Sequence, residues 1–233
     1  GCLMRLPVFN PREIPSDSFN EDSGLPAWPD RQITREDLMR ALAHPVQGVT
    51  EHLLRRDTLL TEAELRPAAV LILLLESEQG FDVVLTVRAA HLRHHAGQVS
   101  FVGGQVEVGE TMERAALREA YEEIGVQPDD IEVLGELPVY HTITGFAVTP
   151  VVACMSEQAW HEQNLDIAVD EVDHVFTVPL SHLLDVANTR VHYYTWEERT
   201  RQYYSVTFGD YFIWGASMAM LRNLDVLLRH ANA

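Results

Sequence analysis

Hydrophobic and polar positions follow two different periods along the chain, and each period predicts its own elements. Short apolar or β-branched runs predict strands at 68–75, 82–88, 98–102, 131–138, 146–155 and 174–180, and aromatic-rich strands over 191–207. Apolar residues spaced by three or four predict helices at 33–44, about 111–124, 180–186 and 212–231. Thr34 is the expected N-cap of the first helix. Because helices and strands do not alternate strictly, we expect an α/β protein with a mixed sheet flanked by helices.

The domain organisation predicted from the sequence is simple. Residues 7–32 contain five prolines and no clear period, so residues 1–32 are expected to form an extended N-terminal arm. Residues 33–233 show no internal repeat and no low-complexity tract, which predicts a single domain. No apolar run approaches the roughly 18 residues of a membrane span. The first residues also lack the apolar segment of a signal peptide.

The charge balance limits what the protein binds. All 17 basic residues are arginine, and 35 acidic residues bring the formal net charge to −18. This charge opposes non-specific nucleic-acid binding, and an anionic substrate would need local cations such as metal ions and a few arginines. Cys2 and Cys154 cannot form a disulfide framework, which favours a cytoplasmic location. No motif indicates a membrane contact or a protein partner.

The predicted helix at 111–124 concentrates acidic residues. They are Glu119, Glu122 and Glu123. On a helical wheel Leu117, Tyr121 and Ile124 share one face, which we expect to pack, and the three acids point away from it. Like charges four residues apart destabilise a helix. The acids are therefore either a solvated face or a set of oxygen ligands for a hard divalent cation. Just before the helix, Gly103 and Gly104 allow close approach of a backbone to a ligand or a neighbouring chain.

The stretch from 104 to 126 resembles the Nudix hydrolase motif, G-x5-E-x7-R-E-U-x-E-E-x-G-U, where U is a bulky aliphatic residue. The matching positions are Gly104, Glu110, Arg118, Glu119, Glu122, Glu123, Gly125 and Val126. Ala120 departs from the motif because it is small at a U position. The resemblance implies the Nudix fold, an α/β/α sandwich with a mixed β-sheet. It also implies Mg²⁺- or Mn²⁺-dependent hydrolysis of a nucleoside diphosphate linked to another group.

The same resemblance assigns roles to individual residues. The implied metal site is Glu119, Glu122, Glu123 and Gly104. The implied catalytic acids are the same three glutamates together with Glu171, and the general base is either Glu119 or Glu171. Glu110, Arg118 and Gly103 are implied to support the site.

The segment before the motif, LTVRAAHLRHHAGQVSFVGGQ at 85–105, resembles the additional motif of coenzyme A pyrophosphatases. The matching positions are Leu85, Thr86, Arg88, Leu92, His95, Gly97, Val99, Phe101, Gly103 and Gly104. Val84 and Val102 depart from it, the latter where that motif has proline. The segment is also the most cationic part of the chain, and Arg88, Arg93 and His95 are the expected substrate-binding residues because arginine grips phosphate with a fork of donors.

The expected reaction is hydrolysis of coenzyme A or an acyl-CoA to 3′,5′-ADP and a 4′-phosphopantetheine product. One alternative is the same chemistry on ADP-ribose, NADH or a nucleotide sugar. Another is a non-catalytic Nudix domain that binds a ligand as a regulator, which would predict a degraded acidic set. The sequence REAYEE at 118–123 keeps every acid of the motif. A small-molecule substrate is expected throughout, and a homodimer is an expectation from the resemblance alone.

Overall fold

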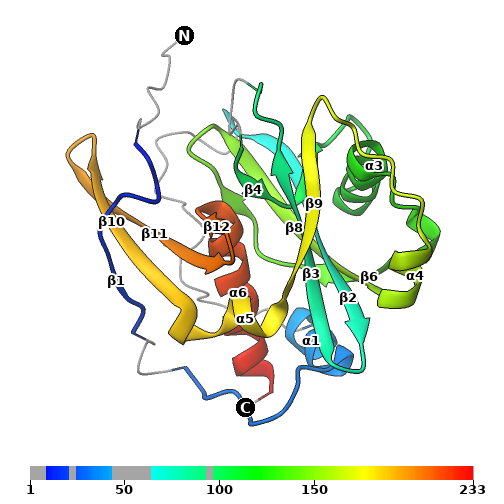
Figure 1. Cartoon of the computed structure of the whole chain (residues 1–233), viewed down its shortest axis with the longest axis horizontal. Coiled ribbons are helices and arrows are strands. Elements are labelled where there is room, and N and C mark those ends of the chain that lie inside the picture. Colours follow the sequence, from blue (N-terminus) through cyan, green and yellow to red (C-terminus); the bar gives the residue numbers. More distant parts are fainter. Residues whose placement is uncertain (1–8, 21–24, 44–63, 93–96, 233) are drawn as a thin grey trace.

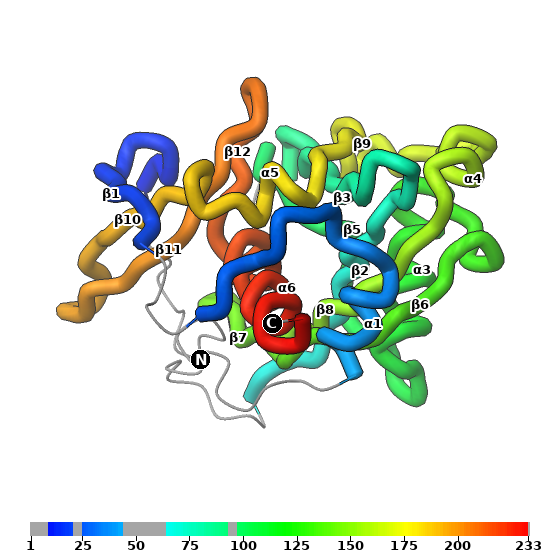
Figure 2. The backbone as a smooth tube through the Cα atoms, turned by 90° about the horizontal axis from the view of Figure 1, so that it is seen from below, coloured from blue at the N-terminus to red at the C-terminus, as the bar shows by residue number. Residues whose placement is uncertain are grey.

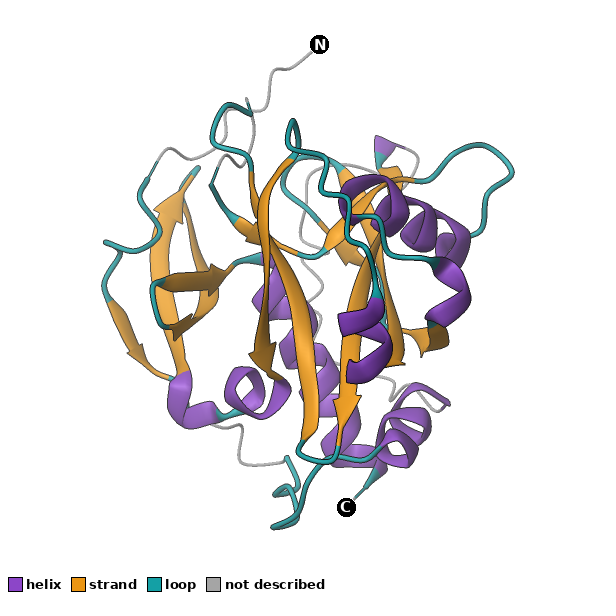
Figure 3. Ribbon diagram, turned by 45° about the vertical axis from the view of Figure 1, so that its right-hand side comes forward, coloured by secondary structure: helices purple, strands orange, loops and turns teal. Residues whose placement is uncertain are grey.

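The computed structural model describes residues 9–20, 25–43, 64–92 and 97–232. Two β-sheets lie on either side of the C-terminal helix α6 (Ala216–Ala231), which is drawn in red between them (Figure 1). Further helices cover the far face of the larger sheet (Figure 3). The predicted α/β class and the mixed sheet flanked by helices are confirmed. Within the described residues, no helix is both long and apolar enough to cross a membrane.

The larger sheet has eight strands. Its strands are β2 (Arg66–Ser77), β3 (Gly80–Arg88), β4 (Val99–Ser100), β5 (Val102–Gln105), β6 (Glu132–Glu136), β7 (Tyr140–His141), β8 (Phe146–Ser156) and β9 (Val172–Pro179). The main order is β4-β3-β2-β8-β6, with β5 on β2, β7 on β8 and β9 on β3. Strands β2 and β8 run parallel, and the other pairings in this sheet are antiparallel. The sheet is therefore mixed.

The smaller sheet is antiparallel and was not expected as a separate unit. It contains β1 (Ser16–Ser18), β10 (Thr189–Trp196), β11 (Arg199–Phe208) and β12 (Tyr211–Trp214) in the order β1-β10-β11-β12. Strand β1 comes from the segment predicted as an arm, and its pairing with β10 places residues 16–18 at the sheet edge (Figure 2). The predicted strands over 191–207 correspond to β10 and β11.

The remaining helices are α1 (Arg35–Ala43), α3 (Met112–Ile124), α4 (Glu157–Glu162) and α5 (Leu180–Leu184). One hydrophobic core lies between the two sheets and includes α6, with Ile72, Leu85, Ile213 and Leu224 among its buried members. A second core lies under α3 and α4, with Leu71, Ala116 and Trp160 among its buried members. Strand β2 serves both cores because its successive side chains point to opposite faces.

Two expectations about elements were wrong in detail, and one short helix was missed. The C-terminal helix begins at Ala216 rather than 212, because Phe212 and Ile213 pair with β11 and Gly215 then turns the chain at φ 65°. The strand expected at 98–102 is divided between β4 and β5. The short helix α4 was not predicted, since six polar-rich residues give no helical period.

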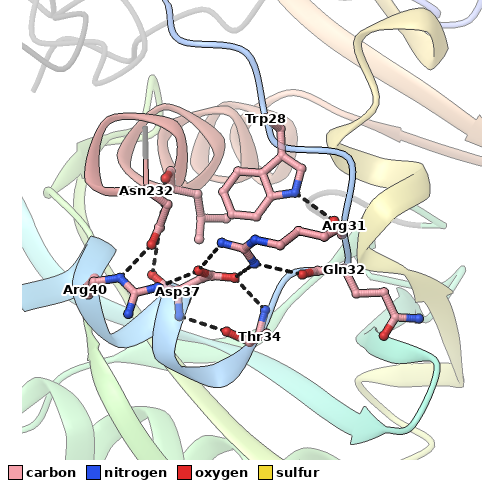
Figure 4. Close-up of polar contacts among 8 residues, drawn as sticks. Trp28, Arg31, Gln32, Thr34, Asp37, Arg40 and Asn232 are labelled. Carbon is pink, nitrogen blue, oxygen red and sulfur yellow. Dashed lines mark hydrogen bonds and ion pairs between the residues drawn. The ribbon is translucent and has the colours of Figure 1, made fainter.

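Polar contacts fix the start of α1 and the segment before it (Figure 4). The Thr34 hydroxyl accepts a hydrogen bond from the Asp37 amide at 3.2 Å, and the Asp37 carboxylate accepts one from the Thr34 amide at 2.8 Å. Thr34 is thus the N-cap, as predicted, in a capping-box arrangement. Arg31 and Arg40 both bond the same carboxylate, and the hydrogen bond from Arg31 holds the pKa of Asp37 well below its ordinary value.

Helix α6 is buried on most of its surface and contains a charged triad. Asp225 accepts hydrogen bonds from Arg222 and from the Arg229 Nε, the latter at 2.9 Å. The side chains of all three residues are less than a tenth exposed. Arg222 also donates to the carbonyl of Leu184, which links α6 to α5. Because buried charges are stable only when paired, the three side chains form one unit.

Candidate active site

Helix α3 carries the acidic residues and has well-defined ends. The Thr111 side chain accepts a hydrogen bond from the Arg114 amide, which caps the N-terminus. Gly125 follows the helix with φ 79°, a left-handed conformation that favours glycine, and its amide bonds the carbonyl of Tyr121. The helix predicted at about 111–124 is confirmed with bounds Met112–Ile124.

The face of α3 that packs against the sheet differs from the predicted one. Tyr121 is 53% exposed, whereas Ala116, Ala120 and Glu123 are buried with Ile124. The alanines explain the difference, because small side chains let the helix approach β2 and β5 closely. Ala120 is therefore buried as a close-packing residue, and its small size at a bulky position of the motif fits this contact. The expected packing of Tyr121 was wrong.

Arg118 is the centre of the hydrogen-bond network on α3. Its guanidinium donates to both carboxylate oxygens of Glu110, at 2.8 and 3.0 Å, and to the carbonyl of Gln105 at 3.0 Å. It also donates to Glu119 and Glu122, each at 3.1 Å. The hydrogen bond from Arg118 lowers the pKa of Glu110. Arg118 thus joins the loop before the helix to the helix itself, and it compensates part of the acidic charge from within the chain.

Glu119 lies directly against Gly104. A Cβ atom on Gly104 would come within 2.4 Å of the Glu119 Oε1, so the carboxylate occupies the space that glycine leaves free. A Cβ atom on Gly103 would come within 2.4 Å of the Ala69 carbonyl oxygen on β2. Both glycines are therefore required by close approach, one to a side chain of the site and the other to the sheet.

The two less exposed acids of α3 carry raised pKa values. Burial raises the pKa of Glu119, with Arg118 acting in the opposite direction. Burial, followed by the charges of Glu119 and Glu171, raises the pKa of Glu123 to about 8. The backbone of Gly103 and the charge of Arg88 oppose that shift without cancelling it. Burial is the largest cause in both residues, so the ionised carboxylates are less stable in the site than in water.

Glu171 lies near the acids of α3 but comes from a different part of the chain. It is exposed, immediately precedes β9, and its charge acts on Glu119 and Glu123. Its carbonyl accepts a hydrogen bond from the Ala89 amide at 2.9 Å, which fixes it beside the end of β3. The structure thus brings Glu171 together with the α3 acids.

Of the expected substrate-binding residues, Arg88 lies at this site. It ends β3, and its buried Nε has no hydrogen-bond partner within the described part of the chain. The charge of Arg88 acts on Glu123, so a guanidinium with an unpaired nitrogen lies near the acids of α3. Arg93 and His95 lie outside the described residues.

The donor set fits a hard divalent cation. The carboxylates of Glu119, Glu122 and Glu123 are oxygen ligands of the kind that Mg²⁺ and Mn²⁺ prefer. A bound cation would favour the ionised forms of Glu119 and Glu123, whose pKa values burial raises. In the described segments no three His, Cys, Asp or Glu residues are already arranged around one point as metal ligands. Arg118 donates hydrogen bonds to Glu119 and Glu122, so these side chains would have to rearrange to bind a metal.

A family model described as the NUDIX domain matches residues 65–197, which is more than half of the chain and contains α3, Gly104 and Glu171. The chain belongs to the Nudix family. The Nudix fold follows from this membership and agrees with the mixed sheet flanked by helices. Residues 65–197 hold the whole of the larger sheet, while β1, α1, β11, β12 and α6 lie outside the match.

The chain is similar to known Nudix proteins in sequence and to solved Nudix structures. A protein named "Uncharacterized Nudix hydrolase NudL" from Enterobacter sp. (strain 638) is 38% identical over 162 residues, covering 68% of this chain and 81% of that protein. A NudL protein from Salmonella paratyphi B is 38% identical over 161 residues, with the same two coverages. Among solved structures, the Nudix hydrolase RenU from M. smegmatis has a TM-score of 0.44 and 21% identity, covering 68% of this chain and 83% of that one.

Proposed function

We propose that this Nudix hydrolase cleaves the diphosphate of coenzyme A or an acyl-CoA, giving 3′,5′-ADP and a 4′-phosphopantetheine product. The observation that carries the proposal is the position of Arg88. It belongs to the cationic segment that resembles the coenzyme A pyrophosphatase motif, and it lies beside Glu123 of the acidic helix. A phosphate-binding arginine next to a metal-binding set suits a substrate with a phosphate besides its diphosphate.

The chain would hold Mg²⁺ or Mn²⁺ through Glu119, Glu122 and Glu123. Gly104, which lies against the Glu119 carboxylate, is the fourth residue of the proposed metal site. A divalent ion there would neutralise the diphosphate and make a coordinated water more acidic. Glu110 and Arg118 keep the loop and the helix in register through their bidentate bond. Arg118 would have to release Glu119 and Glu122 for all three carboxylates to bind the cation.

We further propose Glu171 as the general base, with Glu119 as the alternative. Glu171 is exposed and reaches the site from the loop before β9, so it can accept a proton from water. Glu119 is held by Arg118 and lies against Gly104, which suits a ligand better than a mobile proton acceptor. Arg93 and His95 are proposed as further contacts to the substrate phosphates. A cytoplasmic homodimer is the proposed form of the protein.

Product analysis tests the proposal directly. The protein is incubated with Mg²⁺ or Mn²⁺ and, in parallel, with coenzyme A, dephospho-coenzyme A, ADP-ribose and NADH, and the phosphate products are separated and identified. We expect 3′,5′-ADP from coenzyme A to form fastest. Dephospho-coenzyme A should be slower because it lacks the 3′-phosphate.

Matched variants identify the site responsible. Glu122→Gln should lower turnover at least on the order of 100-fold because it removes a metal ligand. Glu78→Gln makes the same chemical change in the exposed β2–β3 turn and should leave turnover unchanged. Faster hydrolysis of ADP-ribose or NADH would refute the coenzyme A assignment but not the chemistry. No turnover of any substrate with either metal would leave a ligand-binding regulator as the better interpretation.

A further inference from the structure

The segment that carries Glu171 is attached to the C-terminal end of α3. After α4 the chain returns along that end, where the Asp166 amide donates to the carbonyl of Ile124 at 3.0 Å. The Ala168 amide donates to the carbonyl of Glu123 at 2.9 Å. The last carbonyls of a helix have no partner within the helix, so these two bonds satisfy groups that would otherwise need water.

The same segment fixes the backbone of Glu171. The carbonyl of Ala168 accepts hydrogen bonds from the amides of Glu171 and Val172, both at 2.9 Å. Ala168 therefore bonds Glu123 through its amide and Glu171 through its carbonyl. A shift of Ala168 relative to α3 would move Glu171 relative to the acids of the helix.

Gln163 clamps the start of this segment. Its side-chain Oε1 accepts a hydrogen bond from the Gln127 amide at 3.1 Å, and its Nε2 donates to the Asp130 Oδ2 at 2.5 Å. Gln127 and Asp130 lie in the turn directly after α3. Gln163 itself caps α4, whose Trp160 is buried in the core under α3. One side chain thus ties α4, the turn after α3 and the segment that leads to Glu171.

Apolar packing contributes little to the position of this segment. Between 163 and 171, Ile167 packs partly against the core under α3, whereas Leu165 is 36% exposed and Val169 is 73% exposed. Gly125 allows the close approach, because a Cβ atom there would lie 2.5 Å from the Asp166 amide nitrogen. Polar contacts therefore determine where the segment lies, and Gln163 supplies the side-chain part of them.

We propose that Gln163 is a positioning residue that sets the distance between Glu171 and the acids of α3 by clamping the segment 163–171 to the end of that helix. The catalytic part of this inference rests on the proposed function, in which Glu171 accepts a proton from water. Displacement of a catalytic group by about 1 Å lowers the rate by up to roughly 100-fold, so a positional role is measurable.

Three variants and one control test the clamp. Gln163→Ala removes both side-chain bonds. Gln163→Glu keeps an acceptor for Gln127 but places a carboxylate against Asp130. Adding Asp130→Asn to Gln163→Glu supplies an amide donor to the new carboxylate and restores the bond with donor and acceptor exchanged. The control is Gln158→Ala, which removes a side-chain bond to Glu162 on the exposed face of the same helix.

We expect Gln163→Ala and Gln163→Glu to lower kcat about tenfold with little change in KM, because the substrate contacts remain while Glu171 moves. The double variant should recover kcat, and Gln158→Ala should not change it. In a Glu171→Gln background, Gln163→Ala should have no further effect, because its target is already absent. A loss that multiplies with that of Glu171→Gln would overturn the proposal.

Amide hydrogen exchange tests the clamp without any substrate. We expect Gln163→Ala to speed exchange at the amides of Asp166 and Ala168, and Gln158→Ala to leave both unchanged. Unchanged exchange in Gln163→Ala overturns the clamp whether or not the protein hydrolyses a nucleotide. Faster exchange with full kcat also overturns the positional role. Failure of the wild-type protein to hydrolyse any substrate would refute the proposed function and leave the exchange result as the measure of the clamp.

Discussion

Removal of Arg118 should destabilise the metal-free protein strongly, although the residue lies at the surface of α3. Its guanidinium makes five hydrogen bonds, two to Glu110 and one each to Gln105, Glu119 and Glu122. Its side chain is 23% exposed, and those of Glu110 and Glu119 are 13% and 15% exposed. The bond to Glu122 adds little, because that side chain is 54% exposed and solvent screens the pair.

The expected loss of unfolding free energy comes mainly from the hydrogen bonds of Arg118 that are shielded from water. Breaking a buried ion pair by removing one partner costs about 3–5 kcal/mol, and partial exposure reduces this to about 3 kcal/mol for Arg118→Ala. Arg118→Lys keeps the charge but not the planar fork, so about half of that loss is expected. For a chain of this size the Arg118→Ala loss corresponds to a decrease in Tm on the order of 6–12 °C.

Urea unfolding with a metal chelator present measures both variants against the wild-type protein. Arg114→Ala is the control, because Arg114 is exposed one turn earlier on α3, and its loss should cost no more than about 0.5 kcal/mol. If Arg118→Ala costs as little as the control, the network does not hold the loop to the helix and the reasoning is wrong.

Three further predictions follow from contacts elsewhere in the molecule. Asp37→Asn should lower the unfolding free energy by about 2–3 kcal/mol at neutral pH. The folded-state pKa of Asp37 lies below its ordinary 3.8, so the wild-type advantage is complete above pH 3.8 and is lost as the pH falls further. Urea unfolding at several pH values measures this. Asp225→Asn should cost about 3–5 kcal/mol in the same assay, because it leaves two buried arginines without a carboxylate. Gly104→Ala should lower turnover more than stability, since its Cβ displaces the flexible Glu119 side chain, whereas Gly103→Ala meets the β2 backbone and should lower the unfolding free energy.

The sequence predicted the elements whose signals are local. Strand β2 was found because its long apolar run serves two cores, and α3 because its spacing matches a motif with defined ends. The packing face of α3 was missed, because the wheel gave Tyr121 more weight than three alanines, while close approach to the sheet selects small residues. Strand β12 was assigned to the following helix, because the pairing of Phe212 and Ile213 with β11 is a tertiary contact that no local pattern records.

Prediction of the site from the sequence has the same limit, because tertiary contacts leave no local pattern. The motif placed Glu119, Glu122 and Glu123 on one helix, but only the fold shows that Glu123 is buried and Glu122 is exposed. Gln163 gave no sequence signal, because its role depends on a turn 33 and 36 residues away in the chain. Backbone bonds such as that from Ala168 to Glu123 involve no particular side chain and leave no trace in the composition.

Arg118 compensates part of the like charge that clusters on α3. Arg118 satisfies Glu110, whose pKa it lowers, and it also bonds Glu119 and Glu122. Burial nevertheless raises the pKa values of Glu119 and Glu123 with Arg118 and Arg88 in place, so their ionised forms are less stable in the site than in water. Glu123 is the buried acid of the cluster, where water cannot stabilise its ionised form. The divalent cation of the proposed function would stabilise that ionised form, while Arg118 bonds the more exposed Glu122 from within the chain.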